Sequence, residues 1–217
     1  TGRRPGRSPG CQVGMTAHAG NRGYGGSIMD AFRREVLDGF DWIITMDCDE
    51  QHEPESIPDF LAAAAMDDAD IVSGSRYLAA STNGDIPPEN RRAINARITR
   101  MINERLGLRI TDAFCGFKAY RVSALQQLVF DVHGYAFPMQ FWVQAVAGGL
   151  RIKEIPVSLI YNDPNRTFGG PLNDDDVRLR HYVDVFEREM ERCSERIADR
   201  AAINAEAAPT CSACSGE

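Results

Sequence analysis

Lysine is nearly absent from this sequence of 217 residues, and so are long apolar runs and concentrated basic segments. Of the 24 basic residues only Lys118 and Lys153 are lysines, a bias that either phosphate recognition or a GC-rich genome would produce. The formal net charge of −7 argues against a nucleic-acid-binding protein, which would normally show a concentrated basic surface. Any anionic ligand must therefore be held locally.

No stretch approaches the roughly 20 apolar residues that a membrane span requires, and no charged-then-apolar leader opens the chain. We therefore expect a cytoplasmic protein. Its six cysteines are too scattered for a disulfide framework, and the Cys211–Cys214 pair has no second pair to complete a zinc site. The four histidines show no metal-ligand spacing either, so structural or surface roles are expected for them.

Helical and strand patterns alternate along the chain. Apolar residues at helical spacing predict helices, and short β-rich apolar runs predict strands. The predicted helices span residues 27–40, 54–66, 90–106, 140–147 and 176–197, and the predicted strands span residues 42–46, 70–74, 117–120 and 152–160. Alternation of this kind predicts an α/β layer fold with a largely parallel sheet. We expect one domain over residues 21–197, with disordered segments at residues 1–20 and 198–217.

Two aspartates directly follow the apolar strand at residues 42–46. Ligands of open α/β sheets bind outside the carboxyl ends of the strands, so this position favours chemistry over a solvated loop. On extended chain Asp47 and Asp49 would point the same way about 7 Å apart, close enough to share one divalent ion or its water shell. Hard oxygen ligands predict Mg²⁺ or Mn²⁺, completed by phosphate oxygens of a substrate.

Four motifs occur in the order found in family-2 glycosyltransferases, which the sequence resembles from about residue 21 to 182. They are Asn21-Arg22-Gly23-Tyr24-Gly25-Gly26, Asp47-Cys48-Asp49-Glu50-Gln51-His52-Glu53-Pro54, Gly74-Ser75-Arg76-Tyr77 and Thr111-Asp112-Ala113-Phe114-Cys115-Gly116-Phe117. The branch that they resemble is the dolichol- and polyprenyl-phosphate mannosyltransferase branch. This resemblance implies a three-layer GT-A fold and metal-dependent, inverting transfer of a hexose from a nucleotide-sugar donor to a polyprenyl phosphate, with peripheral contact at the inner face of the cell membrane.

The resemblance also implies roles for individual residues. Asp47 and Asp49 would hold the metal on the donor diphosphate, with Gln51 nearby. Arg76 and one of Arg91 or Arg92 match positions that contact the acceptor phosphate. The remaining implied residues are Arg166 on a loop over the site, Asp112 near the acceptor or donor sugar, and Gly23 and Gly25 in a glycine run before the first helix, whose N-terminus could receive an anion. Each arginine could instead be a surface charge, and Asp112 could be a helix cap or turn residue.

The acceptor decides whether a base is needed. A phosphate with a second pKa of about 6 is largely deprotonated at neutral pH. A sugar hydroxyl, the alternative acceptor in polysaccharide or glycolipid synthesis, would need a general base, and Asp112 is the candidate.

The sequence departs from the family at its beginning. Family members start with two strands that hold the nucleotide base and ribose, and residues 1–20 do not resemble them. Without those strands the strand at residues 42–46 would become an exposed apolar edge. We therefore expect the chain to be weak or inactive as an enzyme on its own, and a non-catalytic remnant of the same fold remains the alternative from another functional class.

Overall fold

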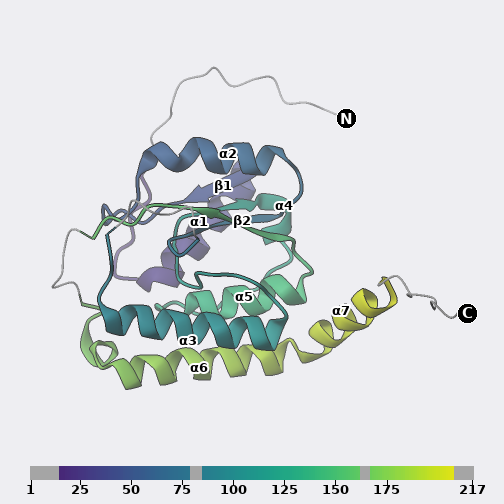
Figure 1. Ribbon diagram of the computed structural model, residues 1–217. Coiled ribbons are helices and arrows are strands. Elements are labelled where there is room, and N and C mark those ends of the chain that lie inside the picture. Colours follow the sequence, from purple (N-terminus) through teal and green to yellow (C-terminus); the bar gives the residue numbers. More distant parts are fainter. Residues whose placement is uncertain (1–14, 79–84, 162–166, 208–217) are drawn as a thin grey trace, which may run out of the picture.

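A computed structural model describes residues 15–78, 85–161 and 167–207 of the chain. In this part helices pack in layers around one sheet, so the predicted α/β class is confirmed (Figure 1). The strands are β1 (Trp42–Thr45), β2 (Ile71–Ser75), β3 (Lys118–Arg121) and β4 (Ile152–Pro156). The helices are α1 (Gly23–Asp38), η1 (Pro54–Ser56), α2 (Ile57–Ala65), α3 (Glu89–Leu106), α4 (Val122–Leu125), α5 (Phe137–Ala147), η2 (Gly170–Asn173), α6 (Asp175–Arg192) and α7 (Ser194–Ala207), where η marks a 3₁₀-helix.

The sheet is mixed, so the prediction of a largely parallel sheet is wrong. Its order is β1-β3-β2-β4, in which β3 is antiparallel to both neighbours and β2 is parallel to β4. Strands β1, β2 and β4 therefore run in one direction and β3 runs between them in the other. Alternation of helices and strands does not reveal this reversal, because it depends on which distant strands pair.

This topology explains why several motifs meet. The carboxyl ends of β1, β2 and β4 and the amino end of β3 all lie at one edge of the sheet. The segments that meet there are residues 46–51 after β1, 76–78 after β2, 157–161 after β4 and 111–117 before β3. Ligands of α/β sheets generally bind beyond the carboxyl ends of the strands. Here that position lies beyond the carboxyl ends of β1, β2 and β4, and the amino end of β3 lies beside them.

Each face of the sheet has its own core, because successive side chains of a strand point to opposite faces. Val72 and Ala119 pack with Phe60 of α2 in one core, whereas Ile71 and Tyr120 pack in the other with α1, α3, α5 and α6. Figure 1 accordingly shows α2 on one side of the sheet and α3, α5 and α6 on the other. The four residues of β1 are half-buried, which fits its place at the end of the strand order.

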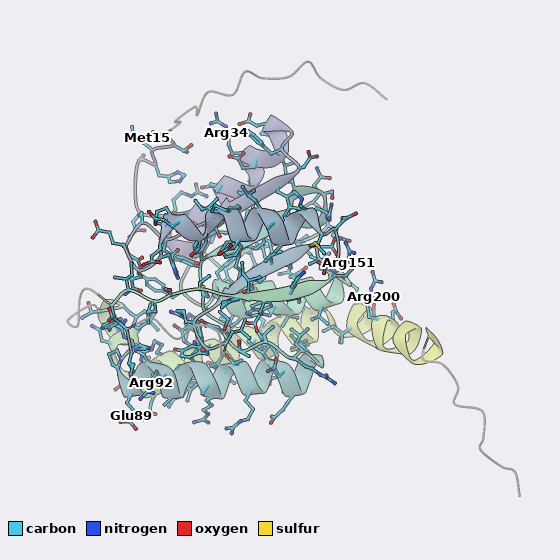
Figure 2. All side chains as sticks on the ribbon, turned by 45° about the horizontal axis from the view of Figure 1, so that its top comes forward. Met15, Arg34, Glu89, Arg92, Arg151 and Arg200 are labelled. Carbon is cyan, nitrogen blue, oxygen red and sulfur yellow. The ribbon has the colours of Figure 1, made fainter. Side chains whose placement is uncertain are left out.

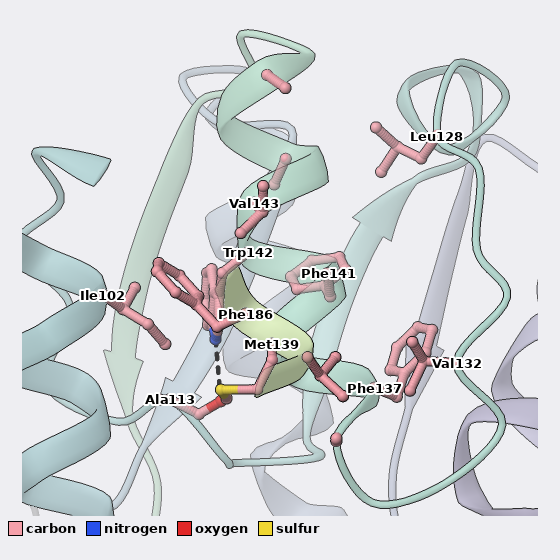
Figure 3. Close-up of a cluster of buried hydrophobic side chains, with 14 of the residues drawn as sticks. Ile102, Ala113, Leu128, Val132, Phe137, Met139, Phe141, Trp142, Val143 and Phe186 are labelled. Carbon is pink, nitrogen blue, oxygen red and sulfur yellow. Dashed lines mark hydrogen bonds between the residues drawn. The ribbon is translucent and has the colours of Figure 1, made fainter. Parts of the chain in front are cut away.

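The core that contains α5 also holds the loop before β3. Trp142 is fully buried, and its indole nitrogen donates a hydrogen bond of 3.0 Å to the carbonyl oxygen of Ala113 (Figure 3). Met139, Phe141 and Phe186 surround this contact with apolar side chains. Helix α5 therefore holds the loop that carries Asp112 in place.

The helix ends agree with the sequence in two places and differ in a third. Gly39 and Gly107 end α1 and α3 with φ of 75° and 67°, a left-handed conformation that glycine adopts without strain. The single helix predicted over residues 176–197 is in fact two, α6 and α7, which divide at Cys193, and α7 runs on to Ala207, past the predicted domain boundary.

Two further expectations concern the ends of the chain and the membrane. Most of the predicted terminal segments, including Cys211 and Cys214, lie outside the described residues, so the division into three segments stays a prediction. None of the described helices is long and apolar enough to cross a bilayer.

Candidate active site

A cavity of about 590 Å³ lies where the four strand ends meet. Its wall includes Asp47, Asp49 and Gln51 after β1, and Arg76 and Tyr77 after β2. The rest of the wall comes from helices and loops, namely Asn21, Gly23, Tyr24, Ser27, Ile28, Met46, Cys48, Pro87, Arg91, Ile94, Asn95, Phe114, Tyr135, Pro138, Leu159, Tyr161, Thr167, Phe168, Arg178 and Tyr182. The cavity thus has carboxylates and guanidinium groups in one enclosure.

The two predicted metal-binding aspartates both line this cavity and are half-buried. Asp47 lies against Gly116, where a β-carbon would come within 2.3 Å of a carboxylate oxygen, so a residue without a side chain is needed there. Asp49 accepts a hydrogen bond of 3.2 Å from the backbone nitrogen of Gln51 across a tight turn in which Glu50 has a φ of 60°. A non-glycine residue in this conformation is uncommon and often marks a functional turn.

These residues fit a divalent cation of a particular kind. In the described part of the chain no group of three or more His, Cys, Asp or Glu side chains is placed to hold a metal. Two carboxylates suit Mg²⁺ or Mn²⁺, which keep waters and take phosphate oxygens of a substrate to complete their coordination. The donor set therefore fits a metal that binds together with a phosphorylated substrate and not a closed protein-only metal site.

Arg76 is a cation of the cavity that is held by a buried carboxylate. Its Nε lies 2.6 Å and its Nη2 2.9 Å from the two carboxylate oxygens of Asp112, and its side chain is 17% exposed. Asp112 is fully buried and also accepts hydrogen bonds from the Asn95 amide (2.8 Å) and the backbone nitrogen of Phe114 (3.1 Å). Burial would raise the pKa of Asp112, but the adjoining Arg76 guanidinium and these hydrogen bonds hold that pKa well below its usual range.

This placement bears on the predicted role of Asp112. Its side chain does not line the cavity, and its oxygens are used by Arg76, Asn95 and the backbone. A carboxylate with a lowered pKa and no access to the cavity is poorly suited to accept a proton from a substrate. The geometry favours a different role, in which Asp112 holds Arg76 in place.

The glycine run at the start of α1 has a packing explanation. A β-carbon at Gly23 would lie 2.4 Å from the carbonyl oxygen of His133, and one at Gly25 would lie 2.1 Å from that of Val132. The backbone of α1 therefore approaches the 132–133 loop too closely for side chains at these positions. Gly23 lines the cavity and Gly25 does not, so a ligand role remains a prediction for the first and is not favoured by geometry for the second.

The structure separates the two candidate arginines of α3. Arg91 lines the cavity, with its guanidinium carbon 5.1 Å from the centre of the Phe168 ring and 5.8 Å from that of Tyr161. Arg92 is exposed and lies with Glu89 on the outer side of the helix (Figure 2). Arg166 lies outside the described residues, so its predicted place over the site stays a prediction.

One cation of the cavity was not predicted from the sequence. Arg178 of α6 has a side chain only 4% exposed, and its guanidinium carbon lies 4.5 Å from the Phe168 ring centre, so this ring lies close to the guanidinium groups of both Arg91 and Arg178. Arg178 also donates to the carbonyl oxygen of Leu172 (2.7 Å) and to Asp175. The only local signal was the spacing of Asp175 and Arg178, which is that of an ordinary surface ion pair on a helix.

Two neighbours of the carboxylates are kept uncharged. Burial raises the pKa of Tyr24 well above its usual value, and the negative charge of Asp47 adds to this effect, so the phenol remains a hydrogen-bond donor. Burial lowers the pKa of His52 to about 4, helped by the nearby positive charge of Arg76. His52 packs against Phe117 with ring centres 5.4 Å apart and is neutral at physiological pH, as expected of a structural histidine.

Comparison with known proteins identifies the family. The profile of "Glycosyl transferase family 2" matches residues 10–129, more than half of the chain. The chain belongs to glycosyl transferase family 2. The predicted membership is thereby confirmed.

The chain is also similar to curated proteins with related names. The chain is 31% identical over 141 residues to undecaprenyl-phosphate mannosyltransferase of Micrococcus luteus, covering 64% of this chain and 57% of that protein. It is 30% identical over 134 residues to polyprenol monophosphomannose synthase of Mycolicibacterium smegmatis, covering 56% of this chain and 49% of that protein. The chain thus spans about half the length of these relatives.

Solved structures show the same fold. Glucosyl-3-phosphoglycerate synthase of Mycobacterium tuberculosis, in complex with UDP, superposes with a TM-score of 0.54 at 14% identity, over 79% of this chain and 55% of that one. The same enzyme has been solved with Mn²⁺, UDP and phosphoglyceric acid, and that structure superposes with a TM-score of 0.51 at 15% identity. At such low identity the likeness shows the fold alone.

Proposed function

We propose that this chain carries the metal-binding and acceptor-binding part of an inverting GT-A hexosyltransferase, which moves a hexose from a nucleotide-sugar to a polyprenyl phosphate. Family membership and two relatives named for polyprenyl or undecaprenyl phosphate support the class of reaction. The single observation that carries the proposal is Arg76, clamped by Asp112 at the wall of the cavity that Asp47 and Asp49 also line. One cavity then offers a place for each of two anionic substrates.

The carboxylates serve the donor in this proposal. Asp47 and Asp49 would hold Mg²⁺ or Mn²⁺, with Gln51 beside them, and Tyr24 would offer its hydroxyl proton as a hydrogen bond in the same wall. A bound divalent cation would supply Lewis-acid stabilisation of the charge that builds on the departing nucleoside diphosphate.

The arginines serve the acceptor. Arg76 presents a guanidinium whose direction is fixed by two hydrogen bonds to Asp112, so little entropy is lost when it binds phosphate oxygens. Arg91 adds a second cation from α3, and Arg178 adds positive charge behind Phe168. Inverting transfer requires the acceptor to approach the anomeric carbon opposite the leaving diphosphate, so alignment of two anions is the main task of the site.

A phosphate acceptor fits this cavity better than a sugar hydroxyl. A phosphate oxygen is already deprotonated at neutral pH and needs little help from a base. A hydroxyl would need one, and Asp112, the candidate base, is buried beneath Arg76 with a lowered pKa. The arrangement therefore favours a lipid phosphate, reached at the inner face of a membrane.

The first test is metal and nucleotide binding, because it does not require a complete enzyme. Mn²⁺ binding followed by electron paramagnetic resonance, with and without UDP or GDP, should show tighter binding in the presence of the nucleotide. Asp47→Asn and Asp49→Asn should each weaken binding, whereas Asp59→Asn, which alters an exposed acid on α2, should not. If the unaltered chain binds neither Mn²⁺ nor nucleotide, the chain is a non-catalytic remnant.

The second test concerns the acceptor. Radiolabelled nucleotide-sugars are offered with undecaprenyl phosphate or with a glycan that has free hydroxyls. Charged lipid-linked product, lost in Arg76→Ala, supports the proposal. Neutral glycan product alone would mean a sugar-hydroxyl acceptor.

A further inference from the structure

Glu154 on β4 holds the loop that carries Asp112, although neither motif nor spacing singles it out. One carboxylate oxygen accepts hydrogen bonds from the backbone nitrogen of Thr111 (2.8 Å) and from its hydroxyl (2.9 Å). The other accepts from the backbone nitrogen of Asp112 (3.2 Å). Three donors of two successive residues thus converge on one side chain of a neighbouring strand.

The hydroxyl of Thr111 connects Glu154 to the segment that carries Arg76. Because the carboxylate only accepts, the Thr111 hydroxyl donates to it and must itself accept from Ser75, whose oxygen lies 2.6 Å away. The hydroxyl of Ser75 in turn accepts from the backbone nitrogen of Tyr77 at 3.1 Å. A directed series of hydrogen bonds therefore runs from the cavity wall to Glu154.

Both Arg76 and Asp112 are thus held in place by the carboxylate of Glu154. Glu154 fixes the backbone of Asp112 directly, and it fixes the residues on either side of Arg76 through Thr111 and Ser75. We propose that Glu154 is a positioning residue, which sets the direction of the Arg76 guanidinium at the cavity wall. The proposal deepens the function proposed above by naming what aligns its anion-binding arginine, but its structural claim can be tested without substrate.

Exchange of the Arg76 Nε proton with solvent reports this alignment directly. The proton is held by Asp112 at 2.6 Å, so it exchanges slowly while the pair is intact and its assignment follows from its loss in Arg76→Lys. Glu154→Gln keeps the size of the side chain but puts an NH₂ group where one of two oxygens must accept. Its Arg76 Nε exchange should be faster by about tenfold, because local opening becomes easier, whereas the backbone amide of Val143 in α5 should change less than about twofold.

A second pair of variants keeps the test decisive if Glu154→Gln does not fold. Thr111→Val removes the connecting hydroxyl and should accelerate Arg76 Nε exchange, and Thr111→Ser should restore it to the unaltered rate. Lys153→Gln is the matched control, because it removes the 2.7 Å ion pair of the adjacent β4 residue with Asp68 and should leave Arg76 unchanged.

A purely structural role makes the opposite prediction. Glu154→Gln would then lower the free energy of unfolding and accelerate Arg76 and Val143 equally, or leave Arg76 unaffected, and either result overturns the proposal. These measurements use the ligand-free chain, so absence of transferase activity would count against the proposed function without touching this inference. Where the chain is active, the expected change is a raised KM for the acceptor with a smaller change in kcat.

Discussion

The two edges of the sheet both carry aspartates bonded to arginines, and they differ in what surrounds them. At the edge where β1, β2 and β4 end, Asp112 is fully buried and its partner Arg76 is 17% exposed and lines the cavity. At the opposite edge Asp70 bonds to Arg151 and Arg121, but Arg151 is 51% exposed and none of the three lines the cavity. The same residue types therefore adjoin a cavity at one edge of the sheet and form a surface cluster at the other.

This difference indicates that two properties decide whether an ion pair can serve in ligand binding. They are the burial of its carboxylate and the access of its guanidinium to the cavity. A pair in water is screened and contributes little, whereas a buried carboxylate strongly attracts the one guanidinium that reaches it. Arg76 is held by such a carboxylate and still has one side open to the cavity. Arg151 also makes two hydrogen bonds to the Asp70 carboxylate and a third to the carbonyl oxygen of Asp67, but its side chain is 51% exposed, so water competes for these bonds and they contribute less to stability.

Removing the buried carboxylate should have the largest effect. Asp112→Ala leaves Arg76 without its anchor, and we expect a loss of about 3 kcal/mol in unfolding free energy and at least about a hundredfold loss of any transferase activity. Urea denaturation and initial rates check the two quantities. The comparison of the two edges would be wrong if Asp112→Ala were no more destabilising than Asp70→Ala.

The stabilising effect of Asp112 should also depend on pH. The pKa of Asp112 is lowered in the folded chain, so its stabilising contribution is complete above the ordinary carboxyl pKa of about 4 and is lost as the pH falls below it. The difference in unfolding free energy between the unaltered chain and Asp112→Ala should therefore be constant from pH 7 to about pH 5 and should shrink in more acidic buffer.

A methyl group beside Asp47 tests the cavity edge without changing any charge. In Gly116→Ala the new β-carbon would meet the Asp47 carboxylate at 2.3 Å, so the carboxylate or the loop must move. We expect Mn²⁺ affinity to fall by about tenfold, as for other displacements around metal ligands. Gly134→Ala is the control, because a β-carbon there meets nothing within 4 Å. Equal Mn²⁺ affinities in the two variants would place the metal elsewhere.

Glu189 tests whether a buried carboxylate affects ligand binding even when it lies away from the cavity. It is as buried as Asp112, but it lies between α5 and α6 and accepts from the amides of Gln140 (2.9 Å) and Gln144 (2.5 Å). Glu189→Gln sets amide donors against each other, and a loss of about 1–2 kcal/mol in unfolding free energy is expected. Mn²⁺ and nucleotide binding should be unchanged, since none of the three side chains lines the cavity. If folded Glu189→Gln lost Mn²⁺ or nucleotide binding, burial of a carboxylate would affect binding without any contact with the cavity.

The sequence predicted the parts of the site that are local. The strand followed by Asp47 and Asp49 and the position of Arg76 are each encoded within a few residues. The direction of β3 could not be predicted in this way, because it depends on a pairing between distant strands.

Partners fixed by tertiary structure were also beyond the sequence. Asp112 precedes a strand, as a catalytic residue would, but which oxygens are used depends on Arg76 and Asn95, far along the chain. Arg178 has the local pattern of a surface ion pair, and only the packing of α6 against Phe168 brings it to the cavity. Sequence motifs located the edge of the sheet, and long-range contacts determine which side chains line the cavity there.

The smallest effect is expected at the opposite edge. Bonds from Arg151 lower the pKa of Asp70 to about 2, so its contribution to stability is complete above about pH 4 and is lost as the pH falls through about 2. Asp70→Asn at pH 7 should cost only about 1 kcal/mol in unfolding free energy, because the half-exposed Arg151 is screened by water. Added salt should reduce this cost further, whereas the cost of Asp112→Ala should change little, since buried pairs are screened much less. A cost of Asp70→Asn that is larger than that of Asp112→Ala, or one that is insensitive to salt, would mean that the two edges are held by the same kind of interaction and that the cavity edge is not special.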